Sequence, residues 1–459
     1  MSQNYRVQNP KTDEIEQTFE FATDAAIGQA ITDSADAFQQ WRQTSFDERK
    51  KVLNNAAKLL RERAPELAEI VATEMGKELG SGIGEVKYSA KILDYYADNG
   101  AEFAQDEKIP HSGGTAIMRR LPVGPLLGVM PWNFPYYQVA RFAAPNLMVG
   151  NTILLKHAEI CPRSSAAFAQ ILTEAGLPEG AFINLYATHD QVSTIIADPR
   201  VRGVSLTGSE RAGSAVAAQA GKALKKCVLE LGGTDAYIVL DAADIPAAAR
   251  QAWDKRLANT GQACTSNKRI IVLNDIYDDF VAEMVRIAKD YQPGDPLDGA
   301  EGKYYPLSSR AAAETLDQQV KEAVEAGARL HVGGELAEVG AYYSPAVLTD
   351  VPVGSESYYT EFFGPVAEIY RVGSEEEAIA LANDSRYGLG GAVFSTDEER
   401  AKHVASQIET GMIHVNIPQA SAPELPFGGI KNSGYGRELS PLAMDEFVNK
   451  QTFYVNEKE

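Results

Sequence analysis

Cys264 is the residue of this sequence best suited to nucleophilic chemistry. It lies in the stretch 259–265, Asn-Thr-Gly-Gln-Ala-Cys-Thr, between a run typical of a helix (245–258) and a strand-like run (269–273). Glycine and small polar neighbours at such a junction place the thiol on a backbone turn. A thiolate attacks carbonyl carbons well, but an ordinary thiol has a pKa of about 8.5 and needs activation. Most free cysteines are small buried hydrophobic residues, and Cys264 alone leaves that interpretation open.

Three further segments accompany the cysteine: Pro-Trp-Asn-Phe-Pro at 131–135, Glu-Leu-Gly-Gly at 230–233 and Glu-Phe-Phe-Gly-Pro at 361–365. In this order, and together with the cysteine stretch, they resemble the motifs of the aldehyde dehydrogenase superfamily. The resemblance covers nearly the whole chain, and chance agreement of four such motifs is very improbable. It implies that the protein oxidises an aldehyde with a nicotinamide cofactor.

The resemblance assigns three catalytic residues. A carbonyl carbon releases a hydride only after a nucleophile has made it tetrahedral, and Cys264 is the expected nucleophile. Glu230 is the expected general base, for the thiol or for the water that cleaves the thioester. Asn133 is the expected donor to the oxyanion, together with the backbone N–H of Cys264. The alternatives are a solvated or helix-capping Glu230 and an Asn133 that serves only the turn between two prolines.

The same resemblance implies a dinucleotide site. Gly208 and Ser209 open a helix after a strand, so that free N–H groups and the helix dipole face an anion, and Gly213 allows close helix packing. This is not the usual GxGxxG pattern and is weak evidence by itself. The remaining residues that the resemblance assigns to the cofactor are Trp132, Lys156, Glu159, Leu231, Glu361 and Phe363.

Within this set, Lys156 and Glu159 match positions that contact the adenosine ribose. A carboxylate at position 159 repels a 2′-phosphate, so NAD is expected to be favoured, although Lys156 alone could serve NADP as well. The alternative for both residues is an ordinary charged loop. Trp132 is also expected, with its neighbour Phe134, to pack around the substrate tunnel.

Arg141 and Ser421 match positions that bind the far carboxylate in succinate-semialdehyde dehydrogenases. A guanidinium can hold a carboxylate with two hydrogen bonds. The alternative for Arg141 is a structural ion pair, and one departure weakens the match, since Asn259 stands where many such enzymes carry a further arginine. The sequence therefore predicts a succinate-semialdehyde-like substrate, with other small aliphatic or carboxylated aldehydes as alternatives.

The elements that must position these residues alternate between strand and helix. This rhythm favours an α/β fold of doubly wound parallel sheets, with two lobes that meet near Gly232. No strand-like run precedes the glycine-rich run 80–84, so it is not expected to be a dinucleotide motif. We interpret it as a flexible break between two helices. The resemblance implies a Rossmann-type cofactor domain (1–103 and 123–231), an α/β catalytic domain (232–440) and a small oligomerisation element (104–122 and 441–459). It also implies a homodimer or homotetramer.

Composition narrows the classes of function. The 459 residues are too many for one core, and a net charge of −20 argues against nucleic acid and anionic membranes as partners. Neither a signal peptide in the first residues nor a membrane-spanning apolar run is evident. Three cysteines without metal-type spacing fit a reducing cytoplasm, and six histidines form no metal-binding pattern.

Three other functions compete with hydrolytic aldehyde oxidation. A non-catalytic binding protein with the same fold would not need Cys264, Glu230, Asn133 and Glu361 together. A CoA-acylating dehydrogenase passes its acyl group to CoA and can dispense with a base, so Glu230 favours hydrolysis. A cysteine protease is disfavoured because no histidine lies in a recognisable partnering motif.

Overall fold

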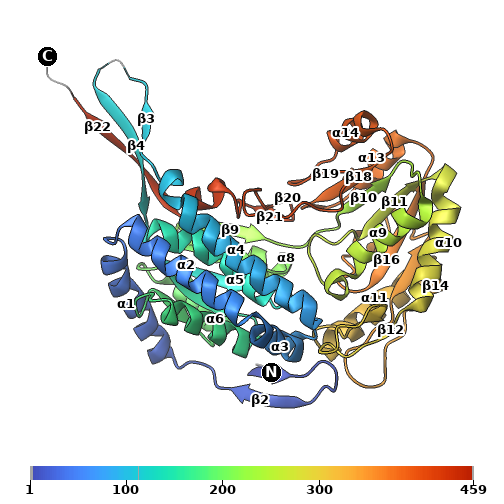
Figure 1. Cartoon of the computed structure of the whole chain (residues 1–459), viewed down its shortest axis with the longest axis horizontal. Helices are drawn as coiled ribbons and strands as arrows, with labels where there is room; N and C mark the ends of the chain where they lie inside the picture. The colour runs from blue at the N-terminus through green and yellow to red at the C-terminus, as the bar shows by residue number, and fades with distance from the viewer. Residues whose placement is uncertain (1–3, 112, 457–459) are drawn as a thin grey trace.

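The computed structural model describes residues 4–111 and 113–456. The sequence-based prediction that the chain has no signal peptide concerns a segment whose residues 1–3 lie outside the described residues. The chain forms two lobes, each built on a sheet of mainly parallel strands with helices on both faces (Figure 1). The predicted α/β architecture is thereby confirmed.

The sheet of the first lobe has its described strands in the order β21-β9-β8-β5-β6-β7. All neighbours are parallel except β21, which returns late in the chain to pair antiparallel with β9. The functional loops therefore follow the carboxyl ends of β5, β6, β8 and β9, where open α/β sheets place their ligands. The strands are β5 (Pro125–Met130), β6 (Thr152–His157), β7 (Phe182–Asn184), β8 (Gly203–Thr207), β9 (Lys226–Glu230) and β21 (Gly434–Tyr435).

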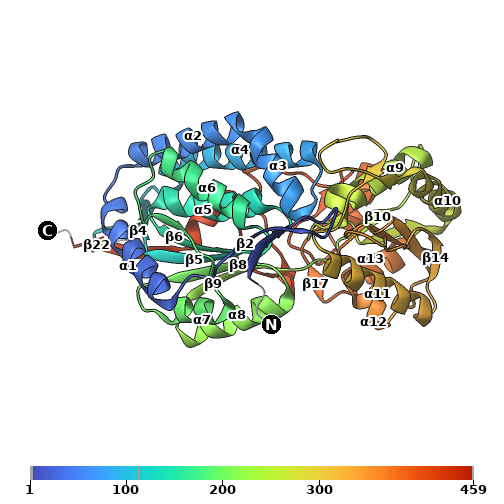
Figure 2. The same ribbon diagram turned by 90° about the horizontal axis from the view of Figure 1, so that it is seen from below.

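Helices cover both faces of this sheet, as Figure 2 shows from below. Because side chains alternate along a strand, Leu154 of β6 packs with one helical layer while Ile153 and Leu155 pack with the other. The first layer holds α1 (Asp24–Trp41), α7 (His189–Ala197) and α8 (Glu210–Lys222). The second holds α2 (Phe46–Glu62), α3 (Ala64–Met75), α4 (Leu79–Phe103), α5 (Pro135–Val149) and α6 (Pro162–Glu174).

Helix α4 corrects one expectation. The run 80–84 is not a break between helices, because α4 passes through it without interruption from Leu79. The Glu78 side chain caps the helix by accepting hydrogen bonds from the N–H groups of Gly80 and Ser81. A β-carbon on Gly82 would lie 3.0 Å from Cβ of Ala68, so this glycine lets α3 and α4 pack closely. Gly82 thus serves helix packing, and the run 80–84 is continuous helix and not a hinge.

The second lobe has the strand order β14-β15-β16-β11-β10-β18-β19, parallel except for the pair β14 and β15. Strand β15 (Ala346–Thr349) and strand β19 (His414–Val415) were not anticipated from the sequence. The other strands are β10 (Ala236–Val239), β11 (Arg269–Leu273), β14 (Arg329–Val332), β16 (Val366–Val372) and β18 (Gly391–Phe394).

Two helical layers also enclose this second sheet. Tyr237 and Val239 of β10 face one layer, and Ala236 and Ile238 face the other. The first layer is α9 (Ile245–Leu257) and α10 (Asn274–Asp290). The second is α11 (Arg310–Ala326), α12 (Glu356–Tyr359), α13 (Glu375–Asn383) and α14 (Glu398–Ala405).

A third, antiparallel sheet projects from the first lobe (Figure 1). It joins β22 (Val448–Val455) to β4 (Thr115–Pro122) and β4 to β3 (Glu107–Ile109). Short elements complete the fold, namely β1 (Tyr5–Gln8), β2 (Ile15–Phe19), β12 (Gln292–Pro293), β13 (Lys303–Tyr304), β17 (Tyr387–Gly388), β20 (Ile430–Lys431) and the 3-10 helices η1 (Ala258–Gly261) and η2 (Pro441–Asp445). Among the described residues, no helix is both long and apolar enough to cross a membrane.

Candidate active site

Cys264 follows a strained turn between α9 and β11. Asn259 and Thr260 have φ angles of 52° and 54°, and Gly261 has a φ of 74°, so three successive residues occupy the left-handed region. A β-carbon on Gly261 would lie 2.1 Å from the carbonyl oxygen of Gly364, which explains the glycine. Left-handed backbone is rare for residues other than glycine and is often found at functional sites.

Buried Arg256 at the end of α9 holds this turn in place. Its Nη1 donates to the carbonyl oxygen of Gly261 (3.2 Å) and to Oγ of Ser266 (2.7 Å). Its Nη2 donates to the carbonyl oxygen of Phe362 (2.7 Å), and its Nε donates to that of Val366 (2.6 Å). One guanidinium thus ties the cysteine turn to the Glu-Phe-Phe-Gly-Pro segment.

Asn133 reaches the same turn from the first lobe. It lies in the loop between β5 and α5, is almost fully buried, and donates a hydrogen bond from Nδ2 to the carbonyl oxygen of Gln262 (3.0 Å). Asn259 Nδ2 donates to the carbonyl oxygen of Asn133 (2.9 Å) and to that of Gln262 (3.2 Å). The structure therefore brings the predicted oxyanion donor against the backbone that leads into Cys264.

A buried ion pair supports Asn133 from behind. Lys77 is paired with Glu85, and its Nζ also donates to the carbonyl oxygen of Asn133 (2.8 Å). Glu85 in turn accepts hydrogen bonds from the N–H groups of Tyr136 (2.8 Å) and Tyr137 (3.1 Å) at the start of α5. A carboxylate at a helix N-terminus is favoured by the helix dipole. This network fixes the backbone on which the Asn133 amide is mounted.

The Cys264 thiol is half-buried, and its protonation follows its surroundings. Burial raises the pKa of Cys264 to about 11, against the opposing positive charges of Arg141 and Lys268. Lys268 donates from Nζ to the carbonyl oxygens of Ala263 (2.9 Å) and Cys264 (3.0 Å). Cys264 therefore rests as a thiol, and it would need a base to take its proton before it could act as a nucleophile.

Glu230, the predicted base at the end of β9, has its carboxyl group in an apolar setting. The residue is 2% exposed, and neither carboxylate oxygen has a hydrogen-bond partner among the described residues. Burial, reinforced by the neighbouring Glu438, raises the pKa of Glu230 well above its ordinary value, and Arg141 opposes the shift. Oε1 faces Gly428, where an added β-carbon would lie 2.8 Å away. A carboxyl group with raised pKa and free oxygens is suited to exchange a proton near neutral pH.

Glu361 joins two of the predicted motifs. Its Oε1 accepts hydrogen bonds from the N–H of Gly233 (3.2 Å) and from Lys268 Nζ (2.7 Å). A β-carbon on Gly232 would lie 2.4 Å from Glu361 Oε2, so the Gly-Gly pair makes room for this carboxylate. Phe363, two residues after Glu361, packs edge-to-face against Trp132, with the ring centroids 5.7 Å apart.

The predicted adenosine-ribose residues lie together at the end of β6. Buried Lys156 forms a 2.5 Å ion pair with Glu159, whose Oε1 also lies 3.6 Å from Nε2 of His189. Burial alone would raise the pKa of Glu159, but the Lys156 ammonium outweighs it and lowers the pKa below its usual value. Glu159 is therefore an anion at neutral pH, with a lysine beside it.

The segment after β8 fits the phosphates of a dinucleotide. Ser209 caps α8 by accepting a hydrogen bond from the N–H of Ala212, and the first N–H groups of a helix have no partner within the helix. A β-carbon on Gly208 would meet nothing closer than 3.6 Å, so the approach is open. A β-carbon on Gly213 would lie 2.6 Å from the Leu231 side chain, so this glycine lets α8 pack tightly. With Lys156 and Glu159, these residues fit a nicotinamide dinucleotide.

Arg141 is fully buried on α5 and is already paired. Its guanidinium forms an ion pair with Glu438, contacts the Tyr137 hydroxyl (3.2 Å) and Thr207 Oγ1 (3.4 Å), and lies 4.2 Å from the centroid of the Phe427 ring. Arg141 and Cys264 are close enough for the arginine to lower the pKa of the thiol. The guanidinium lies near the nucleophile, but Glu438 occupies part of its binding capacity.

Ser421 lies on the loop after β19 and is exposed, whereas Arg141 is buried. The two predicted carboxylate ligands thus occupy different environments. Asn259 stands at the position where many such enzymes carry a further arginine. Its side chain donates hydrogen bonds to backbone oxygens of Asn133 and Gln262 and so belongs to the cysteine turn.

Five charged residues that contact the candidate site were not anticipated from the sequence, namely Lys77, Glu85, Arg256, Lys268 and Glu438. Each acts through buried contacts to residues distant in the chain, which no local pattern reveals. The one available signal was the pair Lys268 and Arg269, two basic residues at the start of an otherwise apolar strand. All three cysteines are free, and the described residues contain no cluster of His, Cys, Asp and Glu that could hold a metal ion.

Comparison with known proteins places this geometry in a family context. Residues 1–453 match the model of the aldehyde dehydrogenase family. A protein of Deinococcus radiodurans named succinate-semialdehyde dehydrogenase [NADP(+)] is 49% identical over 444 residues, which cover 96% of this chain and 93% of that protein. An Escherichia coli protein named succinate semialdehyde dehydrogenase [NAD(P)+] is 40% identical over 447 residues, covering 97% and 96% of the two chains.

Solved structures agree with the fold. The succinic semialdehyde dehydrogenase of Streptococcus pyogenes, in complex with NADP+, superposes with a TM-score of 0.96 at 46% identity, over 99% of this chain and 100% of that chain. The predicted aldehyde dehydrogenase-like α/β fold is confirmed by this likeness.

Proposed function

This chain belongs to the aldehyde dehydrogenase family, and from that premise we propose that it oxidises succinic semialdehyde to succinate with NAD(P)+. The observation that carries the proposal is the near-full-length identity to relatives named for this reaction. The clustering of Cys264, Asn133 and Glu361 at the junction of the lobes supports it further.

In the first step Cys264 adds to the aldehyde. Its proton passes to a base, for which Glu230 has free carboxylate oxygens, and the sulfur forms a bond to the carbonyl carbon. The carbonyl oxygen becomes an oxyanion. Asn133 Nδ2 uses one hydrogen for Gln262, so its second hydrogen remains for this oxyanion, beside the N–H of Cys264.

In the second step the tetrahedral carbon loses a hydride and becomes a thioester on Cys264. The nicotinamide, when bound, supplies the hydride acceptor. Glu230 releases the thiol proton to solvent before hydrolysis. Water then attacks the thioester, Glu230 accepts one proton of that water, and the carbon–sulfur bond breaks to give the Cys264 thiolate and the carboxylic acid, which ionises to succinate. Lys156, Glu159, Gly208, Ser209 and Glu361 would hold the cofactor, and Trp132 with Phe363 would border the nicotinamide.

For the cofactor, NADP+ is accepted as well as NAD+ under this proposal. The names of the relatives specify NADP+ or NAD(P)+, and the Streptococcus pyogenes structure contains NADP+. The preference for NAD+ expected from Glu159 stays a prediction. The carboxylate repels a 2′-phosphate, while Lys156 next to it attracts one.

The antiparallel arm supports a further proposal, that the protein assembles as a homodimer or homotetramer. Strand β22 is an edge strand, and it exposes Phe453, Tyr454 and Val455. An exposed edge with apolar side chains is a ready site for pairing with another chain.

Steady-state kinetics test the proposed function directly. NADH or NADPH formation is measured with succinic semialdehyde and with neutral aldehydes, of which butanal has the same number of carbon atoms. The expected result is a much higher kcat/KM for succinic semialdehyde, with succinate as the product in the presence or absence of CoA. An equal kcat/KM for butanal would refute the substrate, and turnover that depends on CoA would refute hydrolysis.

A further inference from the structure

The backbone N–H of Cys264 is the second donor proposed for the oxyanion, and it belongs to the peptide unit that begins with the carbonyl group of Ala263. A peptide unit is planar and normally trans, so its C=O and N–H groups point in opposite directions. This N–H donates a hydrogen bond to no described residue. A backbone donor left without a partner beside the nucleophile is available to an oxyanion. The contacts of the Ala263 carbonyl therefore decide where the N–H points.

Two donors hold the carbonyl oxygen of Ala263. The N–H of Ser266 donates to it at 3.1 Å and closes a turn that contains Cys264. Nζ of Lys268 donates to the same oxygen at 2.9 Å, and to the carbonyl oxygen of Cys264 at 3.0 Å. The ammonium group thus contacts the peptide units on both sides of the Cys264 α-carbon. A rotation of either peptide would break one of these hydrogen bonds, so the lysine fixes the direction of the Cys264 N–H.

Lys268 is confined to this position. Its side chain is fully buried, and its Nζ forms an ion pair with Oε1 of Glu361 at 2.7 Å. An ammonium has three N–H groups, and here the two carbonyl oxygens and the carboxylate oxygen supply three acceptors. A buried charge is costly without such partners, so the group has little freedom to move. Lys268 is therefore a fixed cation between the cysteine turn and the Glu-Phe-Phe-Gly-Pro segment.

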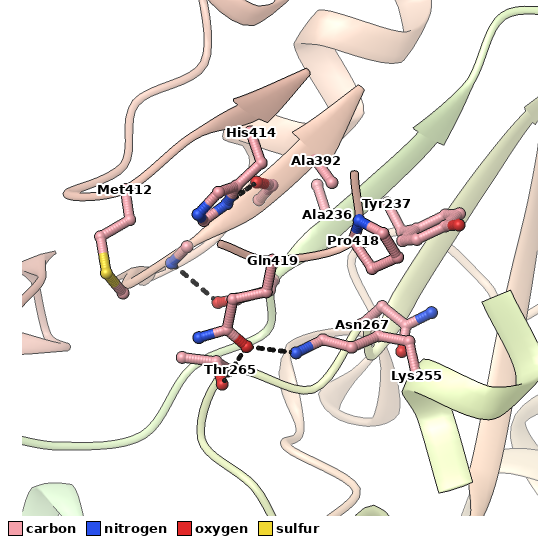
Figure 3. A pocket seen from close by; sticks show the side chains of 13 residues that line it. Ala236, Tyr237, Lys255, Thr265, Asn267, Ala392, Met412, His414, Pro418 and Gln419 are labelled. Atoms are coloured by element: carbon pink, nitrogen blue, oxygen red, sulfur yellow. Dashed lines mark hydrogen bonds between the residues drawn. The ribbon is translucent and has the colours of Figure 1, made fainter. Parts of the chain in front are cut away.

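The residue after the nucleophile makes a different kind of contact, which Figure 3 shows. The Thr265 hydroxyl donates to Oε1 of Gln419 at 3.1 Å, and the Lys255 ammonium donates to the same oxygen. The pocket around these side chains has a volume of only about 10 Å³, so it has no room for a ligand larger than a water molecule. Lys255 interacts with Cys264 through its charge, but its hydrogen bond goes to Gln419. Among the described residues, Lys268 is thus the cation that donates to the peptide units flanking Cys264.

An ammonium group on a carbonyl oxygen also changes the strength of the N–H at the other end of the amide. It draws electron density toward the carbonyl oxygen, so the N–H becomes a stronger donor, and hydrogen bonds in such a chain reinforce one another. Preorganised donors that stabilise a developing oxyanion usually make a large contribution to catalysis. The contact of Lys268 with the Ala263 carbonyl is therefore placed to assist the step in which Cys264 adds to the aldehyde.

We propose that Lys268 is a positioning residue of the oxyanion site, whose ammonium group orients the Ala263–Cys264 peptide and polarises its N–H toward the oxygen of the reacting aldehyde. The inference rests on the proposed function, because it requires that Cys264 adds to a carbonyl carbon, and it gives a role to a residue that the mechanism above does not use. Lys268 acts through the backbone of the nucleophile. It forms no bond with the substrate and exchanges no proton during the reaction.

Two simpler roles of Lys268 predict different results. If the lysine served only as the counterion of Glu361, its loss would weaken cofactor binding and leave the chemistry unchanged at saturating cofactor. If it acted only through its charge on the thiol, its loss would affect the thiolate, since this positive charge opposes the rise in the pKa of Cys264. In that case the rate of the first turnover and the rate of Cys264 alkylation would fall by the same factor.

The test compares the full-length wild type with three variants. Lys268→Met removes every donor, and Lys268→Gln keeps an amide N–H without the charge. Lys255→Met is the matched control, because it removes a cation near Cys264 that donates to Gln419 and not to the flanking peptides. Stopped flow measures NADPH formation in the first turnover at saturating succinic semialdehyde and NADP+. Alkylation of Cys264 by iodoacetamide reports the thiolate at the same pH without cofactor, and calorimetry gives the Kd of NADP+.

In Lys268→Met, we expect the first-turnover rate to fall by about tenfold more than the alkylation rate, because a weakened oxyanion donor affects only the first of these rates. Lys268→Gln should show a smaller excess loss. In Lys255→Met both rates should fall by the same factor. Thermal melting identifies a variant that does not fold, and Lys268→Gln carries the test if Lys268→Met is such a variant.

Three results would overturn the role of Lys268: equal losses of both rates in the Lys268 variants, a raised Kd for NADP+ with an unchanged first-turnover rate, or the same excess loss in Lys255→Met. A wild type that forms neither NADH nor NADPH with any aldehyde would overturn the proposed function, and this role with it. A wild type that oxidises butanal as well as succinic semialdehyde would overturn only the substrate, and the variants are then compared on butanal.

Discussion

The side-chain amide of Asn133 donates a hydrogen bond to the backbone oxygen of Gln262, 3.0 Å away, although 129 residues separate them along the chain. Asn133 belongs to the first lobe, and Gln262 belongs to the turn that carries Cys264 in the second. One hydrogen of the amide thereby fixes the side chain, and the other is left for the oxyanion. The same contact joins the lobes and orients the proposed oxyanion donor.

Asn133→Ala removes the oxyanion donor and is expected to lower kcat. Loss of one such donor typically costs about 2.7–4 kcal/mol of transition-state stabilisation, which corresponds to roughly 10²- to 10³-fold. KM should change far less than kcat, because the interaction strengthens as the oxyanion forms. Kinetics with succinic semialdehyde at saturating cofactor provide the measurement. An unchanged kcat would show that Asn133 serves only the turn.

The buried Arg141–Glu438 pair leads to a prediction about stability. Removing one partner leaves an uncompensated charge in the core, which typically costs about 3–5 kcal/mol, so Arg141→Met alone should lower Tm markedly. The double variant Arg141→Met with Glu438→Gln removes both charges and should melt closer to the wild type. Differential scanning calorimetry of the two proteins makes the comparison. A double variant less stable than the single one would contradict a paired structural role for Arg141.

The protonation of Cys264 predicts how its alkylation depends on pH. Burial raises the pKa of the thiol to about 11. The fraction of reactive thiolate should therefore keep rising with pH above the ordinary thiol pKa of about 8.5. In the enzyme without cofactor, the rate of modification by iodoacetamide should rise about tenfold per pH unit between about pH 8 and about pH 9.5. Cys264→Ser supplies the background from Cys161 and Cys227. A rate that is half-maximal near pH 8.5 and levels off about one pH unit higher would mean that the surroundings do not raise the pKa.

Glu159 predicts a shift in cofactor preference. In Glu159→Gln the carboxylate that repels a 2′-phosphate is gone, while Lys156 remains free to attract that phosphate. The ratio of kcat/KM for NADP+ to that for NAD+ should therefore rise by about tenfold. The measurement is initial rates with each cofactor at fixed aldehyde. If the ratio stays constant, Glu159 does not face the ribose.

Many helices and strands could be predicted from the periodicity of hydrophobic residues and from capping and turn residues. The elements that were predicted wrongly or missed have physical explanations. The capping box of α2, with Ser45 as N-cap and Glu48 three residues on, was correctly predicted because it is local. The run 80–84 was misread as a break between helices, since glycine lowers helix propensity, and only the close contact of Gly82 with Ala68 reveals why it is tolerated. Strand β15 was missed because its four residues are too few to show an alternating pattern of hydrophobic and polar side chains.

The candidate site divides in a similar way. Residue type and order along the chain were enough to recognise the motifs around Asn133, Glu230, Cys264 and Glu361. The charged residues that pair with them could not be recognised in this way. Lys268 contacts the carbonyl oxygen of Cys264 and the carboxylate of Glu361 at once, yet these two partners lie far apart in the chain. Such contacts depend on how distant segments of the second lobe fold together, so the sequence pattern does not contain them.

The proposed mechanism requires that the sulfur of Cys264 carries the acyl group of a carboxylated aldehyde after its hydride has left. Glu230→Gln removes the proposed base from both proton transfers, so the thioester should form slowly and be hydrolysed slowly, and it should accumulate during a long incubation with succinic semialdehyde and NADP+. Intact-protein and peptide mass spectrometry after acid quenching is the most direct measurement. The mechanism predicts one succinyl group, located on Cys264 and absent without the cofactor. An unmodified Cys264 peptide, or steady-state turnover that persists in Cys264→Ser, would contradict it.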